Sequence, residues 1–231
     1  MMMPFRVFVT ATDTGVGKTE TSCALLSLLA EAGHRPVGFK PYESGCEDLE
    51  RPADALRHKQ ASGASEPLSQ VSLHRFREPL APGVAAERLG QVPDFQKTLD
   101  AFHAFQGRSV VVEGAGGLLV PLDSQRRVID LVSALQLPVV LVARAGLGTI
   151  NHTGLSLEAL FRRNLPVKAV VLSKGFEGVD VSEEDNPRWI ARLYGVPVFG
   201  PVPFVQDAAL RHETFRQVLR PLLDTTGIRP G

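Results

Sequence analysis

The segment FVTATDTGVGKTE, residues 8–20, decides the fold that we expect. It begins inside a β-branched apolar run, RVFVT at 6–10, and ends in the residues GKT (17–19), which open a helical apolar repeat. A strand, a turn and a helix in this order are the context that a phosphate-binding loop requires. Thr12 stands where the usual motif has its first glycine. Because the turn needs only free backbone N–H groups, we still predict a nucleotide site rather than a fortuitous glycine turn.

Three kinds of group in this loop suit ATP. Successive backbone N–H groups and the positive end of the following helix surround phosphate oxygens. The ammonium of Lys18 neutralises the β- and γ-phosphates, and the hydroxyl of Thr19 binds Mg²⁺. We therefore expect ATP as co-substrate and Mg²⁺ as cofactor. The residues expected to contact the nucleotide here are Thr14, Gly15, Val16, Gly17, Lys18, Thr19 and Glu20.

Further apolar runs follow along the chain and alternate with helical patterns. The expected strands after the first are PVGFK (36–40), SVVVE (109–113), PVVLVA (138–143), VKAVVLS (167–173) and VPVFGPV (196–202). The expected helices are 19–32, 53–61, 94–105, 128–135, 151–163, 186–194 and 207–223. Near-continuous apolar runs between helices are typical of parallel strands covered on both faces. We predict an α/β fold of the P-loop NTPase type: a mostly parallel, doubly wound sheet with helices on both faces, in a single domain over 1–231.

Local signals place some ends of these elements. Asp94 and Asn151 are good helix N-caps, whereas Gly33 and Gly195 are expected to end helices. Residues 41–93 are rich in proline and lose the regular pattern. We interpret this stretch as a functional excursion from the sheet.

Composition limits the partners and the compartment. Lys plus Arg and Asp plus Glu both number 25, so the formal charge is zero and predicts no broad attraction to nucleic acid or membranes. The two cysteines, Cys23 and Cys46, are too few for a disulfide framework. The N-terminus lacks a basic and apolar signal, and no run of about 18 apolar residues occurs. We expect a soluble cytoplasmic protein whose partners are small molecules, without nucleic acid or membrane.

Charged residues directly follow two predicted strands. Ligands of open α/β sheets bind at the carboxyl ends of the strands. Lys40 follows the second strand, where it can hold a transferring phosphoryl group or an anionic reactant. Glu113 ends the third strand, where its carboxylate can reach a metal at the phosphate loop. The alternatives are a solvated edge lysine at position 40 and a plain tight turn at 113–117.

Other positions have weaker patterns. Residues 145–152 lead from the fourth strand into a helix and offer free N–H groups to a substrate carboxylate, although simple capping by Asn151 is an equal alternative. Asp54 starts a helix, so it can also be a first-turn carboxylate with no other role. Ser44 is unremarkable on its own.

Taken together and in order, the strand-end motifs resemble those of the dethiobiotin synthetase family. The motifs are TDTGVGKT (12–19), FKPYESG (39–45), PADAL (52–56), VVEGAGG (111–117), LGTINH (147–152) and GPVPF (200–204). GKT and EGAGG are shared with related ATPases, whereas the K-P-x-x-S-G and G-x-I-N-H elements together are not.

The resemblance implies an ATP-dependent ring closure in biotin biosynthesis, catalysed by an ADP-forming cyclo-ligase that makes carbon–nitrogen bonds. 7,8-Diaminononanoate and CO2 would give dethiobiotin, ADP and phosphate. An amine would add CO2 to form a carbamate, which ATP would convert into a carbamic-phosphoric anhydride. The second amine would then displace phosphate and close the cyclic urea.

The same resemblance assigns roles to charged residues of this chain. It implies that Mg²⁺ is bound, directly or through water, by Thr19, Asp54 and Glu113. Lys18 and Lys40 are the expected catalytic charges, which stabilise the carbamate and the transferring γ-phosphoryl group.

For the substrate, the resemblance implies contact with Ser44 and a homodimer in which the substrate carboxylate reaches the partner subunit. Thr149 and Asn151 are the candidates for that contact. Further nucleotide contacts are expected from Glu113, Gly114, Ala115, Gly116, Ser173, Lys174, Val202, Pro203 and Phe204.

The chain departs from the family pattern at a few positions. Ala11 stands where some relatives have glycine, and Gly15 stands where they often have glutamate. The loss of an acidic side chain from the loop should alter the γ-phosphate contacts but not the fold. The base-reading position is commonly Asn and here is Ser173. The methylene stem of Lys174 can lie along the base, with 202–204 on another side.

Two other ATPase classes are alternatives. A partition-type or septum-positioning ATPase usually has an additional lysine early in the loop and, for membrane binding, a basic amphipathic C-terminal helix. Here the early loop is Ala11, Thr12 and Asp13, and the last predicted helix has mixed charge. A cobyrinate-type synthase would need a glutaminase domain, for which 231 residues leave no room.

Overall fold

The structure is a computed structural model that describes residues 3–224. The C-terminal segment 225–231, for which the sequence predicts fraying, lies outside the described residues.

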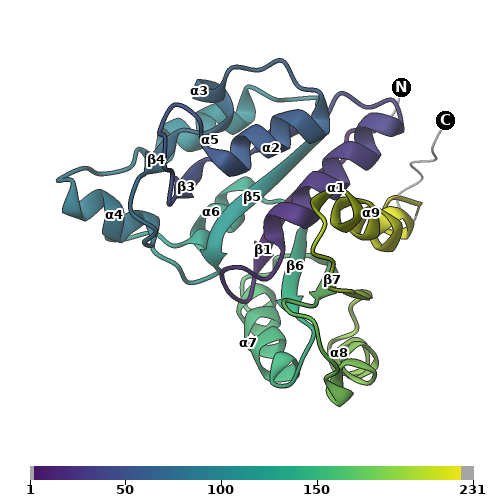
Figure 1. The fold of residues 1–231 in the computed structure, drawn as a ribbon. Helices are drawn as coiled ribbons and strands as arrows, with labels where there is room; N and C mark the ends of the chain where they lie inside the picture. Colours follow the sequence, from purple (N-terminus) through teal and green to yellow (C-terminus); the bar gives the residue numbers. More distant parts are fainter. Residues whose placement is uncertain (1–2, 225–231) are drawn as a thin grey trace.

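A six-stranded parallel sheet forms the centre of the molecule (Figure 1). Its strands are β1 (Arg6–Ala11), β2 (Val37–Phe39), β5 (Val110–Gly117), β6 (Val139–Arg144), β7 (Val167–Ser173) and β8 (Val198–Val202). Their order is β2-β5-β1-β6-β7-β8, and every neighbouring pair is parallel. The chain therefore winds outward from β1 in both directions, which confirms the predicted doubly wound sheet. Loops at the carboxyl ends of β5 and β6 flank the loop after β1, which is where such sheets bind ligands.

Helices cover both faces of this sheet, as predicted. They are α1 (Lys18–Glu31), α2 (Ala53–Ser62), α3 (Leu68–Val71), α4 (Pro82–Arg88), α5 (Phe95–His103), α6 (Val128–Leu135), α7 (Thr149–Phe161), α8 (Asn186–Tyr194) and α9 (Ala208–Asp224), with a 3₁₀ turn at Val181–Glu183. In β6, Val140 and Val142 pack in a core with α1 and α9, whereas Leu141 and Ala143 pack with α7 and α8. Because successive strand residues point to opposite faces, β6 is apolar throughout its buried part.

The predicted helix ends are partly right. Asp94 caps α5 by accepting a hydrogen bond from the N–H of Lys97 at 2.9 Å. Gly195 ends α8 in the left-handed conformation, and Gly33, just past α1, has a φ of 80°. Asn151 as an N-cap is wrong, because α7 already starts at Thr149 after a left-handed Gly148 and has no side-chain cap.

The excursion at 41–93 has more regular structure than the helix predicted at 53–61, which the structure confirms as α2. Residues Tyr42–Ser44 (β3) and His74–Phe76 (β4) form a separate two-stranded parallel sheet, and α2, α3 and α4 lie in the same stretch. The other elements, β3, β4, α3 and α4, have three to seven residues each and are too short to show a period, which is why they were not predicted. This excursion supplies one wall of a cavity that the loop after β1 also lines.

Candidate active site

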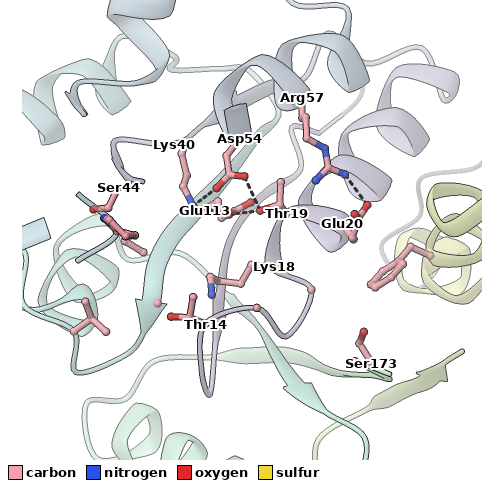
Figure 2. A pocket seen from close by; sticks show the side chains of 18 of the residues that line it. Thr14, Lys18, Thr19, Glu20, Lys40, Ser44, Asp54, Arg57, Glu113 and Ser173 are labelled. Carbon is pink, nitrogen blue, oxygen red and sulfur yellow. Dashed lines mark hydrogen bonds and ion pairs between the residues drawn. The ribbon is translucent and has the colours of Figure 1, made fainter. Parts of the chain in front are cut away.

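A cavity of about 590 Å³ lies at the carboxyl ends of β1, β2 and β5 (Figure 2). The predicted site residues that line it are Thr14, Gly15, Gly17, Lys18, Thr19, Glu20, Lys40, Ser44, Asp54, Glu113, Ala115, Gly116, Ser173, Lys174, Pro203 and Phe204. Val16, Gly114 and Val202, also predicted, are not among its lining residues, and neither are Thr149 and Asn151. The structure thus brings together residues from the phosphate loop, the carboxyl ends of β2, β5, β7 and β8, the short strand at 42–44, and α2.

The phosphate loop turns sharply between β1 and α1. Gly15 and Gly17 have φ values of 75° and 104°, a region that L side chains rarely adopt. A Cβ atom at Gly17 would also lie 3.2 Å from both Ser173 Oγ and the Phe215 ring. Glycine at 17 therefore permits both the turn and the close approach of Ser173.

Lys18 is the first residue of α1 and is buried. Its Nζ donates to the backbone oxygen of Asp13 at 3.0 Å, so it spans the loop. Burial, and then the nearby charge of Lys40, lower the pKa of Lys18 to about 8. An anion bound in the loop would remove this penalty by supplying negative charge.

Lys40 is the centre of an ionic cluster at the floor of the cavity (Figure 2). Its Nζ lies 2.6 Å from Glu113 Oε1 and 3.0 Å from Asp54 Oδ2, and it donates to the Gly114 carbonyl at 3.1 Å. The Thr19 hydroxyl lies within donating distance of two carboxylates, 3.0 Å from Glu113 and 3.2 Å from Asp54. We call Thr19, Lys40, Asp54 and Glu113 the ionic cluster.

Electrostatics favour the charged forms of Lys40 and Glu113. Burial alone would lower the pKa of Lys40, but Glu113 and Asp54 outweigh it and hold that pKa above its usual value. Burial would raise the pKa of Glu113, but Lys40 and then His58 hold it well below its ordinary range. Lys40 is only 4% exposed, so it is not a solvated edge lysine.

Asp54 makes contacts beyond its own helix. It lies in the first turn of α2, whose N-cap position has no side-chain hydrogen bond. The carboxylate that satisfies the helix start is instead Glu43, which accepts from the N–H groups of Asp54 at 2.8 Å and Ala55 at 3.2 Å. Asp54 is thereby left to face Thr19 and Lys40. Sequence reasoning missed Glu43, although it stands inside the FKPYESG motif.

A second group of charges lines the cavity beside α1 and consists of Glu20, which the sequence predicted, and Arg57 and Arg211, which it did not. Glu20 pairs with Arg57 of α2 at 2.7 Å and with Arg211 of α9 at 3.4 Å. Arg211 also donates to the backbone oxygens of Val205 at 2.8 Å and Gln206 at 2.7 Å. These bonds tie the loop after β8 to helix α1, and nothing in the local sequence pattern signals them.

The wall that includes Ser173 and Lys174 comes from the loops after β7 and β8. The Lys174 ammonium is engaged by Glu183 and the Gly178 carbonyl, each at 2.7 Å. Phe204 is 39% exposed at the cavity edge. We call Ser173–Gly175 and Pro203–Gln206 the loop wall.

A separate cavity of about 510 Å³ lies at the start of α7. Asn151 lines it together with Leu147, Glu158 and Tyr194. Thr149 is fully buried, and its hydroxyl lies 3.2 Å from that of Thr153. Within one chain, these two predicted substrate residues therefore stand apart from the ionic cluster.

Comparison with known proteins agrees with this arrangement. A family model described as an AAA domain matches residues 6–210. An ATP-dependent dethiobiotin synthetase BioD of Anaeromyxobacter dehalogenans strain 2CP-C is 46% identical over 215 residues, covering 92% of this chain and 96% of the relative. One of Bacillus licheniformis is 39% identical over 205 residues, 87% of each chain. The chain belongs to the ATP-dependent dethiobiotin synthetase family.

Solved structures support the fold alone. Chloroplast FtsY from Physcomitrella patens matches with a TM-score of 0.53 at 14% identity, over 95% of this chain and 66% of its own. The signal recognition particle 54 kDa protein of Aeropyrum pernix, in complex with GDP, matches with a TM-score of 0.50 at 16% identity. The match covers 98% of this chain and 48% of that protein's chain. This dethiobiotin synthetase family member thus spans about two thirds or less of these more distant chains.

Proposed function

We propose that the chain is an ADP-forming ligase that uses ATP and Mg²⁺ to convert 7,8-diaminononanoate and CO2 into dethiobiotin and phosphate. Its membership of the dethiobiotin synthetase family supports the reaction. The observation that carries the mechanism is Lys40, a buried cation held between two carboxylates on the floor of the cavity that the phosphate loop lines.

The reaction needs an oxygen leaving group to be activated. One amine of the substrate adds to CO2 and loses a proton to give a carbamate. A carbamate oxygen then attacks the γ-phosphorus of ATP and releases ADP. The second amine attacks the carbonyl carbon of the mixed anhydride, loses a proton and expels phosphate, which closes the cyclic urea.

The two lysines fit this sequence because negative charge builds up twice at the same place. Lys18 lies at the loop, where it would neutralise the β- and γ-phosphate oxygens. Lys40 lies across the cavity floor, where its ammonium would hold the carbamate and the transferring phosphoryl group. The carboxylates of Asp54 and Glu113 keep that ammonium charged and fix its direction.

The ionic cluster also fits a magnesium ion. Thr19 Oγ1 lies 3.0 Å and 3.2 Å from oxygens of Glu113 and Asp54. Neighbouring ligands of an octahedral Mg²⁺ at 2.0–2.1 Å are about 3 Å apart, and all three donors are hard oxygens. When bound, Mg²⁺ would neutralise phosphate charge at this point. No group of three or more His, Cys, Asp or Glu within 3–224 could hold a metal, so the hydroxyl of Thr19 is needed to complete the set.

Substrate binding is proposed to involve Ser44 in one subunit and the start of α7 in the partner of a homodimer. Ser44 lines the main cavity, whereas Asn151 lines the second cavity, at a distance from the cluster. The exposed Leu147 and Leu155, at 82% and 61%, support contact between subunits there. The Thr149 hydroxyl is already paired with Thr153, so Asn151 is the stronger candidate for the substrate carboxylate.

The compartment and domain organisation are also part of the proposal. We infer a single-domain cytoplasmic enzyme, supported by Cys23 and Cys46, which are buried free thiols. No helix in the described part of the chain is long and apolar enough to cross a membrane.

The direct test is phosphate release from Mg-ATP by the purified protein, with bicarbonate and with or without the diamine. We expect release to depend on the diamine and to match the formation of dethiobiotin, measured by mass spectrometry with labelled bicarbonate. ATP turnover that ignores the diamine but responds to DNA or lipid would instead support a switch ATPase.

A further inference from the structure

One buried polar residue beside the ionic cluster has no place in the mechanism so far. His58 lies on α2, is fully buried and does not line the cavity. Its Nε2 lies 2.9 Å from Glu113 Oε2, and both side chains are completely shielded from solvent. A direct bond between a buried imidazole and a buried carboxylate is specific enough to need an explanation.

The sequence places His58 there through helix spacing and one glycine. Asp54 and His58 are four residues apart in α2, so they share the face of the helix that meets Lys40 and Glu113. Gly38 of β2 allows that helix to come close. A Cβ atom at position 38 would lie 2.5 Å from His58 Cβ and 2.8 Å from Leu26 Cδ1.

The two oxygens of Glu113 have separate partners. Oε1 faces Lys40 and Thr19, whereas Oε2 faces His58. Because a carboxylate oxygen only accepts, the bond requires the proton on Nε2 of the imidazole. With both oxygens held, the carboxylate cannot rotate about its terminal bond.

The other imidazole nitrogen argues against a role in packing alone. Nδ1 of His58 is buried and has no hydrogen-bond partner among residues 3–224. An apolar side chain would fill the same space without leaving a polar atom unsatisfied. The gain from having histidine here must therefore come from Nε2.

We propose that His58 is a positioning residue that holds Glu113 so that Oε1 points at the magnesium site formed with Thr19 and Asp54. It acts through Glu113 and touches neither nucleotide nor substrate. The inference rests on the proposed function, because it takes Glu113 as a metal ligand. Outer partners of this kind typically change metal affinity or activity 10- to 100-fold when they are removed.

The test compares three substitutions at His58 with a matched control. His58→Leu removes the donor, His58→Gln keeps a donor at nearly the position of Nε2, and His58→Asn moves it to the position of Nδ1, too far from Glu113. His34→Leu is the control, since it removes another histidine bond, 2.9 Å to Ser109, outside the cavity. The affinity for ADP is measured by calorimetry, once with Mg²⁺ and once with EDTA. The Michaelis constant for Mg²⁺ is measured in the full reaction.

We expect His58→Leu and His58→Asn to weaken the apparent Mg²⁺ affinity about 10-fold or more, with ADP binding in EDTA unchanged. His58→Gln should recover most of the loss, and His34→Leu should match the wild type. Wild-type Mg²⁺ affinity in His58→Leu, or equal losses in the Gln and Asn variants, would overturn the inference. If His58→Leu does not fold, the comparison of His58→Gln with His58→Asn still tests the inference, because only the Gln variant should keep the Mg²⁺ affinity. A wild-type protein that reacts without Mg²⁺ would defeat the proposed function instead.

Discussion

The ionic cluster and the loop wall line different parts of one cavity, and they hold their side chains by different means. Lys40 and Glu113 are at most 4% exposed and bond to each other directly. In the loop wall, Lys174 pairs with Glu183 and donates to the Gly178 carbonyl, while the carbonyls of Val205 and Gln206 accept from Arg211 of α9. A buried pair has no water to replace a lost partner, whereas an exposed loop can adjust. Substitutions in the cluster should therefore strongly lower kcat and the free energy of unfolding. Substitutions in the wall should only weaken nucleotide binding, and by less.

Lys40→Met should give the largest effect. The carbamate and the transferring phosphoryl group lose their cation, so kcat should fall about 10²- to 10³-fold, as when a single charge-stabilising donor is removed. ADP affinity by calorimetry should stay close to the wild type. Because Glu113 would be left buried without its cation, the free energy of unfolding should also drop by about 3 kcal/mol.

A double variant separates these two consequences. Lys40→Met with Glu113→Gln removes both charges of the 2.6 Å pair, so most of the lost stability should return in denaturant unfolding. Activity should remain lost. If instead Lys40→Met turns over at the wild-type rate, Lys40 has no part in the mechanism.

Arg211→Ala should have the next largest effect, because Arg211 of α9 holds the loop wall by donating to the carbonyls of Val205 and Gln206. The substitution removes two hydrogen bonds that the charged, partly exposed guanidinium donates to this loop. Because the loop lines the nucleotide part of the cavity, the Michaelis constant for ATP should rise about 10-fold, with kcat nearly unchanged. Arg220→Ala is the control, since Arg220 lies on the same helix and pairs with Glu31 outside the cavity. If kcat falls by a larger factor than the Michaelis constant for ATP rises, the wall contributes to the chemical step.

The same contrast explains what the sequence could predict. The strands β1, β2, β5, β6 and β7 were predictable because most of their residues are buried and read as continuous apolar runs. Lys40 and Glu113 were found because strand ends in such sheets converge at a known edge. The short strands β3 and β4 were missed, since three residues cannot establish a period.

Tertiary contacts account for the residues that sequence reasoning missed. His58 matters only because Gly38 admits α2 to within reach of Glu113, across 55 positions of sequence. Arg211 meets Glu20 across 191 positions. Neither spacing follows from a local pattern. The expected cap at Asn151 failed for a related reason, since the backbone of Gly148 begins α7 without any side chain.

Asn151→Ala addresses a place outside both regions, the second cavity at the start of α7. If this surface binds the carboxylate of the substrate held by a partner subunit, losing one hydrogen bond to a charged group, about 1.5 kcal/mol, should raise the Michaelis constant for the diamine about 10-fold. The constant for ATP should not change. Glu158→Ala, in the same cavity, is the matched control for altered shape. A larger change for ATP than for the diamine would place the carboxylate elsewhere.

Ser173→Ala should give the smallest change and is the finest test of the loop wall. The Ser173 hydroxyl is 3.2 Å from where a Cβ atom of Gly17 would stand, so this part of the wall lies directly beside the phosphate loop. One neutral hydrogen bond to the nucleotide contributes about 0.5–1 kcal/mol, which corresponds to a 2- to 5-fold rise in the Michaelis constant for ATP. Steady-state kinetics with ATP, GTP and CTP decide whether that bond reads the base. A rise confined to ATP means that Ser173 selects adenine, whereas equal rises for all three mean that it supports the loop. A loss of 100-fold or more in kcat would contradict the division between a wall that holds nucleotide and a cluster that performs the chemistry.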